Sequence, residues 1–127
     1  MYELQYFDWS DFDCPLSPGS GERYMDRKVV LALEDIIRTE GVHIKNYIHL
    51  AYTSKMRADQ LSLATNDPHR AGLAVRIDTI NNPRRVFKLV RGAMRFGFLQ
   101  IAICTRKRYV HLGMDVMKDL YLTDWSH

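Results

Sequence analysis

The sequence lacks any long apolar run and any leader-like start. No stretch of its 127 residues reaches the roughly 18 consecutive apolar residues of a membrane-spanning helix. The opening residues, MYELQYFDW, are acidic and aromatic and have neither the basic start nor the apolar centre of a secretory signal peptide. We therefore expect a chain that is made and folded in the cytoplasm and does not enter a membrane.

Cysteine is scarce as well. The two cysteines, Cys14 and Cys104, lie far apart and do not form a Cys-x-x-Cys motif, which argues against a zinc knuckle or a redox pair. We expect both to be buried free thiols. The net charge of +3 is small for this length, so the sequence lacks the strong excess charge of most nucleic-acid-binding domains.

What is present is typical of one globular domain. Hydrophobic residues make up 46% and charged residues 26% of the chain, which are ordinary values for a folded protein. The length suffices for one hydrophobic core, and no internal repeat or low-complexity tract divides it. We treat residues 1–127 as a single domain with an extended lead-in over 1–25 and a tail over 115–127.

Two amphipathic helices are predicted with their ends. Asp26 can cap a helix over 26–40 whose apolar residues recur every three to four positions, and Gly41 stands where the helix would end. The dipeptide Asn82-Pro83 supplies a cap and a first-turn proline for the second helix, which should stop at Gly97.

The other expected elements are short. We expect strands over 44–52, 73–80, 98–104 and 109–112, a helical turn over 58–64, and a closing helix in the tail, where Val116, Leu120, Tyr121 and Trp125 recur at near-helical spacing. The basic turn 105–108 would join the last two strands into a hairpin. This order favours an α+β fold, with a small, mainly antiparallel sheet and helices packed on one side.

Two histidines stand beside these strand-like runs. His69 precedes the strand 73–80, and His111 lies within 109–112. Because side chains alternate along a strand, the even-numbered residues of 73–80, including Arg76, share one face. We expect a cleft that collects His69, this face and His111. A third histidine, His49, alternates with apolar residues and is expected to be a hydrogen-bonded structural residue.

Several short motifs occur in a characteristic order. They are Trp-Ser-Asp-Phe-Asp at 9–13, Gly-Ser-Gly-Glu-Arg-Tyr-Met-Asp at 19–26, Ser-Lys-Met-Arg at 54–57, His-x2-Gly-x-Ala at 69–74, Arg-Phe-Gly-Phe at 95–98 and Tyr-Val-His-Leu at 109–112. Together they resemble the D-alanyl-D-alanine carboxypeptidase and Hedgehog-type zinc peptidases, in particular small members encoded by bacteriophages. The resemblance runs from about Phe7 to Asp115 and implies the fold of that family.

The resemblance also implies a zinc centre. His69 and His111 match the first and last histidine ligands of the family. Arg57 matches the arginine that contacts the substrate, and Ser54 opens the same motif. In a working member, three protein ligands and a water hold zinc, which lowers the pKa of the water so that hydroxide attacks the peptide bond.

Three positions depart from the family pattern. Arg76 stands where the family has its aspartate ligand, and the acid that accepts the water's proton is replaced by Arg108 or, in another arrangement of the family, by Gly113. Arginine is always cationic and has no lone pair for a metal. A guanidinium about 4 Å from a divalent cation would be repelled by about 8 kcal/mol at an effective dielectric constant of about 20.

Other carboxylates are considered as replacement ligands. Asp78 shares the face of Arg76 but is displaced by about 6.6 Å along the strand, so we expect it to pair with Arg76 or a nearby base. Asp67 and Asp115 lie in predicted loops and are the remaining candidates. Without such a ligand, His69 and His111 are remnant histidines that bind neighbouring groups by hydrogen bonds.

The sequence therefore predicts a catalytically degenerate zinc-peptidase-like domain with no cofactor. We expect a structural or binding module of a bacteriophage virion, associated with the tail, baseplate or capsid. Its partners would be other virion proteins, further copies of itself or peptidoglycan stem peptides.

Two alternatives remain. The first is an active zinc-dependent peptidoglycan L,D- or D,D-peptidase or endolysin. The second is a basic nucleic-acid-binding protein that uses Arg84, Arg85, Arg91, Arg95 and the turn 106–108, although the charge argues against it.

Overall fold

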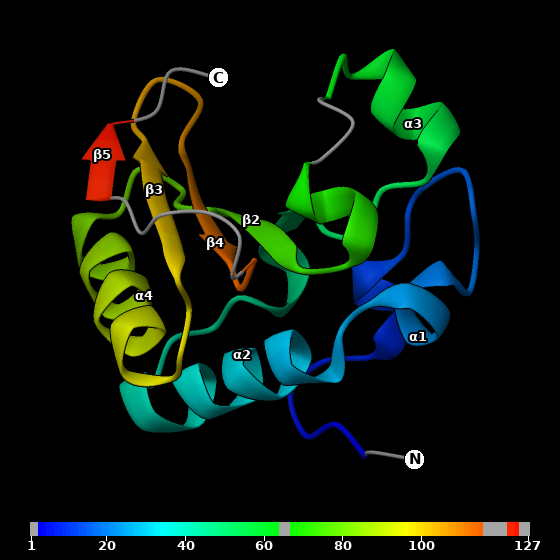
Figure 1. The fold of residues 1–127 in the computed structure, drawn as a ribbon. Helices are drawn as coiled ribbons and strands as arrows, with labels where there is room; N and C mark the ends of the chain where they lie inside the picture. Colours follow the sequence, from blue (N-terminus) through cyan, green and yellow to red (C-terminus); the bar gives the residue numbers. More distant parts are fainter. Residues whose placement is uncertain (1–2, 64–66, 116–121, 125–127) are drawn as a thin grey trace.

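The fold is built on one sheet, and the computed structural model describes residues 3–63, 67–115 and, by their backbone, 122–124 (Figure 1). The strands are β1 (Ile48–Leu50), β2 (Ala74–Asp78), β3 (Gln100–Cys104), β4 (Tyr109–Gly113) and β5 (Leu122–Asp124), in the order β1-β2-β4-β3-β5. Neighbouring strands from β1 to β3 are antiparallel, and β5 joins β3 in parallel. The predicted α+β fold class with a mainly antiparallel sheet is confirmed.

Both long helices begin and end close to the predicted residues. Helix α2 (Arg27–Glu40) is capped by the Asp26 carboxylate, which accepts a hydrogen bond from the Lys28 N–H, and it ends at Gly41 with a φ of +68°. Helix α4 (Pro83–Arg95) is capped by the Asn82 side chain, which accepts hydrogen bonds from two backbone N–H groups of the first turn. Local signals therefore suffice to place these helices.

The shorter elements correct several expectations. The lead-in is not extended throughout, because it contains the 3₁₀ helix η1 (Trp9–Phe12) and the short helix α1 (Ser20–Tyr24). The predicted strand 44–52 divides into the 3₁₀ helix η2 (Lys45–Tyr47) and the short β1. Helix α3 (Lys55–Gln60) begins three residues before the predicted turn 58–64, because Ser54 caps it. A further 3₁₀ helix, η3 (Pro68–Ala71), leads into β2.

The closing helix predicted for the tail is wrong where the structure describes the tail. Residues 122–124 form β5, whose register places Leu122 beside Ile101 and Asp124 beside Ile103. The other residues on which that prediction rested, within 116–121 and 125–127, lie outside the described residues.

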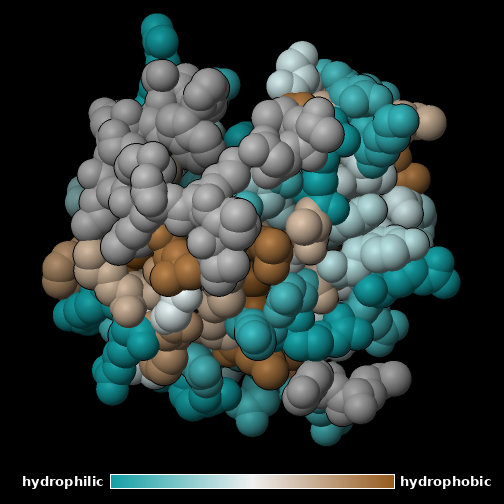
Figure 2. Space-filling model, viewed as in Figure 1, coloured by the Kyte–Doolittle hydropathy of each residue, from teal (hydrophilic) through white to brown (hydrophobic). Residues whose placement is uncertain are grey.

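The surface in the same view is largely polar, with brown and tan residues gathered over α4 and the adjoining part of β3 (Figure 2). Within the described ranges, no helix is long and apolar enough to cross a membrane.

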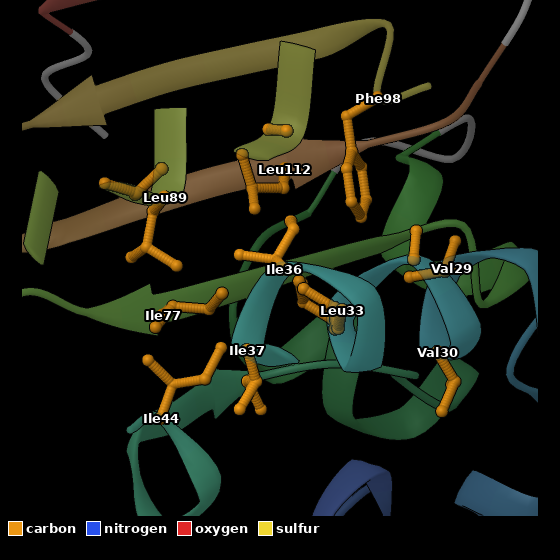
Figure 3. Close-up of a cluster of buried hydrophobic side chains, with 14 of the residues drawn as sticks. Val29, Val30, Leu33, Ile36, Ile37, Ile44, Ile77, Leu89, Phe98 and Leu112 are labelled. Atoms are coloured by element: carbon orange, nitrogen blue, oxygen red, sulfur yellow. The ribbon is translucent and has the colours of Figure 1, made fainter. Parts of the chain in front are cut away.

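The hydrophobic core lies between the sheet and the helices α2 and α4 (Figure 3). Alternate residues of the central strands, such as Ile77 and Leu112, face Ile36 and Leu89 of the helices and are fully buried. The two helices approach closely at Gly92, where an added Cβ would lie 2.8 Å from the Ile36 side chain. The helices therefore cover one face of the sheet, as predicted.

The N-terminal segment is fastened to the core by a buried carboxylate. Glu34 of α2 is 4% exposed and accepts hydrogen bonds of 2.7, 2.8 and 3.0 Å from the N–H groups of residues 5, 6 and 7. Phe7 and Phe12 are then buried against the core. Cys14 and Cys104 are buried thiols that take part in no disulfide among the described residues, as predicted.

Candidate functional site

The face of the sheet opposite α2 and α4 carries the site residues predicted from the sequence. Strand β2 pairs with β4 so that Arg76 lies directly opposite His111, and Asp78 lies opposite Tyr109. Residues that are opposite each other on antiparallel strands project from the same face. Since Val75 and Ile77 point into the core, Arg76 and His111 project together from the other face.

His69 reaches this face from η3. The Asp67 carboxylate accepts a hydrogen bond of 2.9 Å from the His69 N–H and caps the turn. Gly72 closes the turn with a φ of +68°, and an added Cβ there would lie 2.2 Å from the Tyr24 carbonyl oxygen. The glycine of the His-x2-Gly motif is therefore required by both backbone conformation and close packing.

The imidazoles of His69 and His111 contact each other edge to face. Their ring centroids are 5.2 Å apart with an interplanar angle of 72°. His69 Nδ1 lies 3.0 Å from the Ala51 carbonyl oxygen and must donate to it, so Nε2 of the neutral ring carries the lone pair. This Nε2 is buried and has no hydrogen-bond partner within the part of the chain that the structure describes.

His69 is uncharged at neutral pH. Its pKa is lowered from 6.5 to about 4, chiefly by burial and in part by the charge of Arg76, against the opposing effect of Asp67. His69 is fully buried and His111 is 3% exposed, so the expectation that they line an open cleft is wrong. Their imidazoles are enclosed side chains.

Arg76 adds a permanent positive charge beside this pair. Its guanidinium carbon lies 4.8 Å from the centroid of the Tyr109 ring, a cation–π contact. Burial raises the pKa of the Tyr109 phenol, while the charge of Arg76 lowers it. His49, predicted to be a hydrogen-bonded structural residue, is instead exposed and stacks on Tyr109 at a centroid distance of 6.2 Å.

A tight zinc site does not fit this arrangement. Tetrahedral zinc in proteins needs at least three protein ligands, and the pair supplies two imidazoles. Within residues 3–63 and 67–115, no three side chains of His, Cys, Asp or Glu come together in a way that could hold a metal. The Asp78 carboxylate accepts a hydrogen bond from the Ile80 N–H at 2.7 Å, and its expected pairing with Arg76 or a nearby base stays a prediction.

The resemblance places a catalytic acid at position 108 or 113, and the structure shows the surroundings of both. Arg108 is exposed in the turn between β3 and β4, where its carbonyl accepts a hydrogen bond from the Thr79 N–H. At Gly113 an added Cβ would lie 2.2 Å from Oε1 of Gln100 on the neighbouring strand. No acidic side chain therefore fits at 113 unless Gln100 moves.

The predicted substrate-binding residues make other contacts. Ser54 Oγ caps α3 by accepting a hydrogen bond from the Arg57 N–H, and it lies 3.4 Å from Cys14 Sγ. The Arg57 guanidinium donates to Gln60. Burial raises the pKa of the Cys14 thiol, but hydrogen bonds with Ser54 and Leu16 and the charge of Arg57 together lower it below its ordinary value. The backbone connects this group to the histidines, because the Thr53 N–H donates a hydrogen bond to the His69 carbonyl.

Sequence reasoning missed Tyr109 and Gln100. Tyr109 lies two residues before His111 on the same strand, so alternation would have placed it on the same face. Gln100 could not have been found in this way, because its contact with position 113 depends on the pairing of β3 with β4.

No protein-family model matches the chain, and no curated protein matches it. The function must therefore be argued from the site. The face offers a cationic guanidinium, a neutral imidazole with a free lone pair and a second imidazole. This combination suits an anionic or hydrogen-bonding group better than a divalent cation.

Proposed function

We propose that the chain is a catalytically degenerate relative of the D-alanyl-D-alanine carboxypeptidase and Hedgehog-type zinc peptidases that acts as a structural or binding module. One observation carries the proposal: Arg76, at the position of the ligand aspartate, lies in register with His111 on the central strands. The setting in a bacteriophage virion is proposed from the resemblance to phage-encoded members.

The electrostatics support the loss of catalysis. A guanidinium at this position repels a bound cation and cannot donate a lone pair to it. The loss of the proton acceptor is a separate defect, because 108 carries an exposed arginine and 113 is a glycine whose neighbouring space is filled by the Gln100 side chain. Restoring the metal ligand at position 76 would still leave the proton acceptor absent.

The same electrostatics support binding without cleavage. Peptidoglycan stem peptides end in a carboxylate, and the guanidinium of the half-buried Arg76 suits such an anion. Binding would require the face around His111 to open, since that imidazole is 3% exposed.

The proposal is tested by measuring zinc in protein purified without chelator and by zinc titration calorimetry. We expect no stoichiometric zinc in the wild type. Arg76→Asp should gain affinity by at least about tenfold over Arg76→Asn, which removes the same charge but supplies only a weak ligand. Adding His111→Ala to the aspartate variant should abolish the gain.

Two results would contradict the proposal. Stoichiometric zinc in the wild type, lost in His69→Ala and His111→Ala, would show that the site is intact. Equal zinc affinities of the Asp and Asn variants would show that the site geometry, and not only the ligand, differs from the zinc-binding arrangement.

One observation favours the alternative of an active zinc peptidase. His69 Nε2 is buried, carries a lone pair and has no hydrogen-bond donor among residues 3–63 and 67–115, as a metal-ligating nitrogen would in the absence of the metal. Release of fragments from purified peptidoglycan by the zinc-loaded wild type, and none by His111→Ala, would establish this alternative.

A further inference from the structure

The outer face of α4 combines exposed apolar and basic side chains. Phe87 and Met94 are 59% and 53% exposed. They are seven residues apart and therefore lie on the same side of the helix, about two turns from each other. The side that faces the core is formed by Leu89, Gly92 and Ala93. In Figure 2 the apolar colours over α4 border on polar ones.

The charges of α4 are all positive. Helix α4 contains no Asp or Glu. A row of basic residues runs along one flank of Phe87 and Met94: Arg84, Lys88, Arg91 and Arg95. Arg91 is held by the buried carboxylate of Glu40. We call the exposed residues Arg84, Phe87, Met94 and Arg95, with the half-buried Lys88, the α4 surface.

The N-terminal part of the chain has the opposite charge. Residues 1–26 contain six acidic side chains and one basic side chain. Several of the acids serve as caps or pair with Lys45. The exposed acids that do not pair with Lys45 are accompanied by exposed apolar residues, and together we call them the lead-in surface: Glu3, Leu16, Glu22 and Tyr24. Helix α1 lies at the end of the molecule opposite α4 (Figure 1).

We propose that copies of this chain associate head to tail, the α4 surface of one copy docking on the lead-in surface of the next. Each surface offers what the other lacks, since basic residues meet acidic ones and apolar residues meet apolar ones. A two-fold dimer through α4 would instead bring like charges together. A head-to-tail contact between different surfaces builds a ring or a filament.

Two other partners fit the α4 surface less well. Nucleic acid would contact basic side chains through its phosphates, but Phe87 and Met94 occupy the outermost part of this helix. An anionic membrane would use the apolar residues but would leave the acidic lead-in surface unexplained. This inference concerns a surface other than the histidine face and stands whether or not that face binds a ligand.

The test is sedimentation velocity of the full chain over a range of concentrations at low and high salt. We expect open-ended oligomers at low salt that dissociate as salt is raised. Arg84→Glu with Lys88→Glu should weaken association at least about tenfold, because each reversal replaces an attraction by a repulsion. Glu3→Lys with Glu22→Lys should have the same effect.

Mixing provides the sharper result. Each double variant keeps one unaltered surface, so a mixture of the two variants should form dimers but no oligomers larger than dimers. Arg106→Glu with Lys107→Glu makes the same charge change on the turn between β3 and β4 and serves as the matched control, which should assemble like the wild type.

Four results would overturn the proposal. The first is a wild type that stays monomeric at every concentration in low salt. The second is a lead-in variant that still dimerises, which would indicate a two-fold contact through α4. The third is a turn control that loses assembly as fully as the α4 variant. The fourth is a monomer that binds anionic vesicles or DNA through the α4 surface, which would assign that surface to lipid or nucleic acid.

Discussion

His69 should make the fold sensitive to mild acid. In the folded protein its pKa is lowered from 6.5 to about 4, chiefly by burial. The unfolded chain therefore takes up a proton near pH 6.5, whereas the folded chain resists it until about pH 4. The contribution of neutral His69 to the free energy of unfolding is complete above pH 6.5 and decreases as the pH falls from 6.5 to about 4. At about 1.4 kcal/mol per pH unit, the loss over this window is about 3 kcal/mol.

The assay is urea unfolding followed by tryptophan fluorescence across this pH window, on protein treated with chelator. His69→Asn is the informative variant, because its amide can still donate to the Ala51 carbonyl but cannot titrate. The wild type should lose about 3 kcal/mol more than this variant as the pH falls. His49→Asn, at an exposed histidine, should keep the wild-type slope. Parallel pH profiles of the wild type and His69→Asn would refute the reasoning.

Two further predictions concern the framework of the site. Gly72→Ala should lower the free energy of unfolding by about 3 kcal/mol or more, and Gly41→Ala by only about 1 kcal/mol. Both glycines have a φ of +68°, but only a Cβ at 72 meets the Tyr24 carbonyl, so equal losses in denaturant unfolding would contradict this. Glu34→Ala should cost about 2–4 kcal/mol and speed hydrogen exchange at amides 5–7, because its carboxylate accepts their hydrogen bonds. Glu34→Gln should lose less, and unchanged exchange in the alanine variant would show that another contact holds the segment.

The long elements of the fold could be predicted because their signals are local. Asp26 and Asn82 cap the helices whose starts they predict, and Gly41 ends α2 in the left-handed conformation that the sequence suggests. The hairpin of β3 and β4 follows from two apolar runs separated by a polar turn. In each case the deciding residues lie within a few positions of the element.

The shorter elements could not be predicted because distant contacts decide them. The β-forming residues of 44–52 favour a strand, yet β1 pairs with β2 only over three residues and with an irregular register. The strand at Leu122–Asp124 exists by parallel pairing with β3, a partner more than 15 residues away. A near-helical spacing of apolar residues carries no information about such a partner.

Only part of the candidate site could be predicted, because the rest depends on contacts between strands that are distant in the sequence. Alternation along β2 and β4 places Arg76 and His111 on one face, and the pairing register then puts them opposite each other. Sequence alone did not show that Gln100 occupies the space beside Gly113, or that His69 is fully buried. Both depend on which strands are neighbours.

The motif that most resembles a zinc peptidase is also the part of the chain whose presence the fold explains without zinc. Gly72 is required by its backbone conformation and by the closeness of Tyr24, and its carbonyl accepts a hydrogen bond from the N–H of Asp26 at the start of α2. His69 fills a buried position and donates to the Ala51 carbonyl, which joins η3 to the segment after β1. These roles need no metal, so the His-x2-Gly frame is not in itself evidence of zinc-dependent activity. Arg76 is different, because it is half-buried and its guanidinium lies over the Tyr109 ring on the outer face of the sheet. The charge at position 76 can be tested by measuring zinc affinity with and without the His111 imidazole. Such measurements therefore discriminate between a peptidase and a binding module.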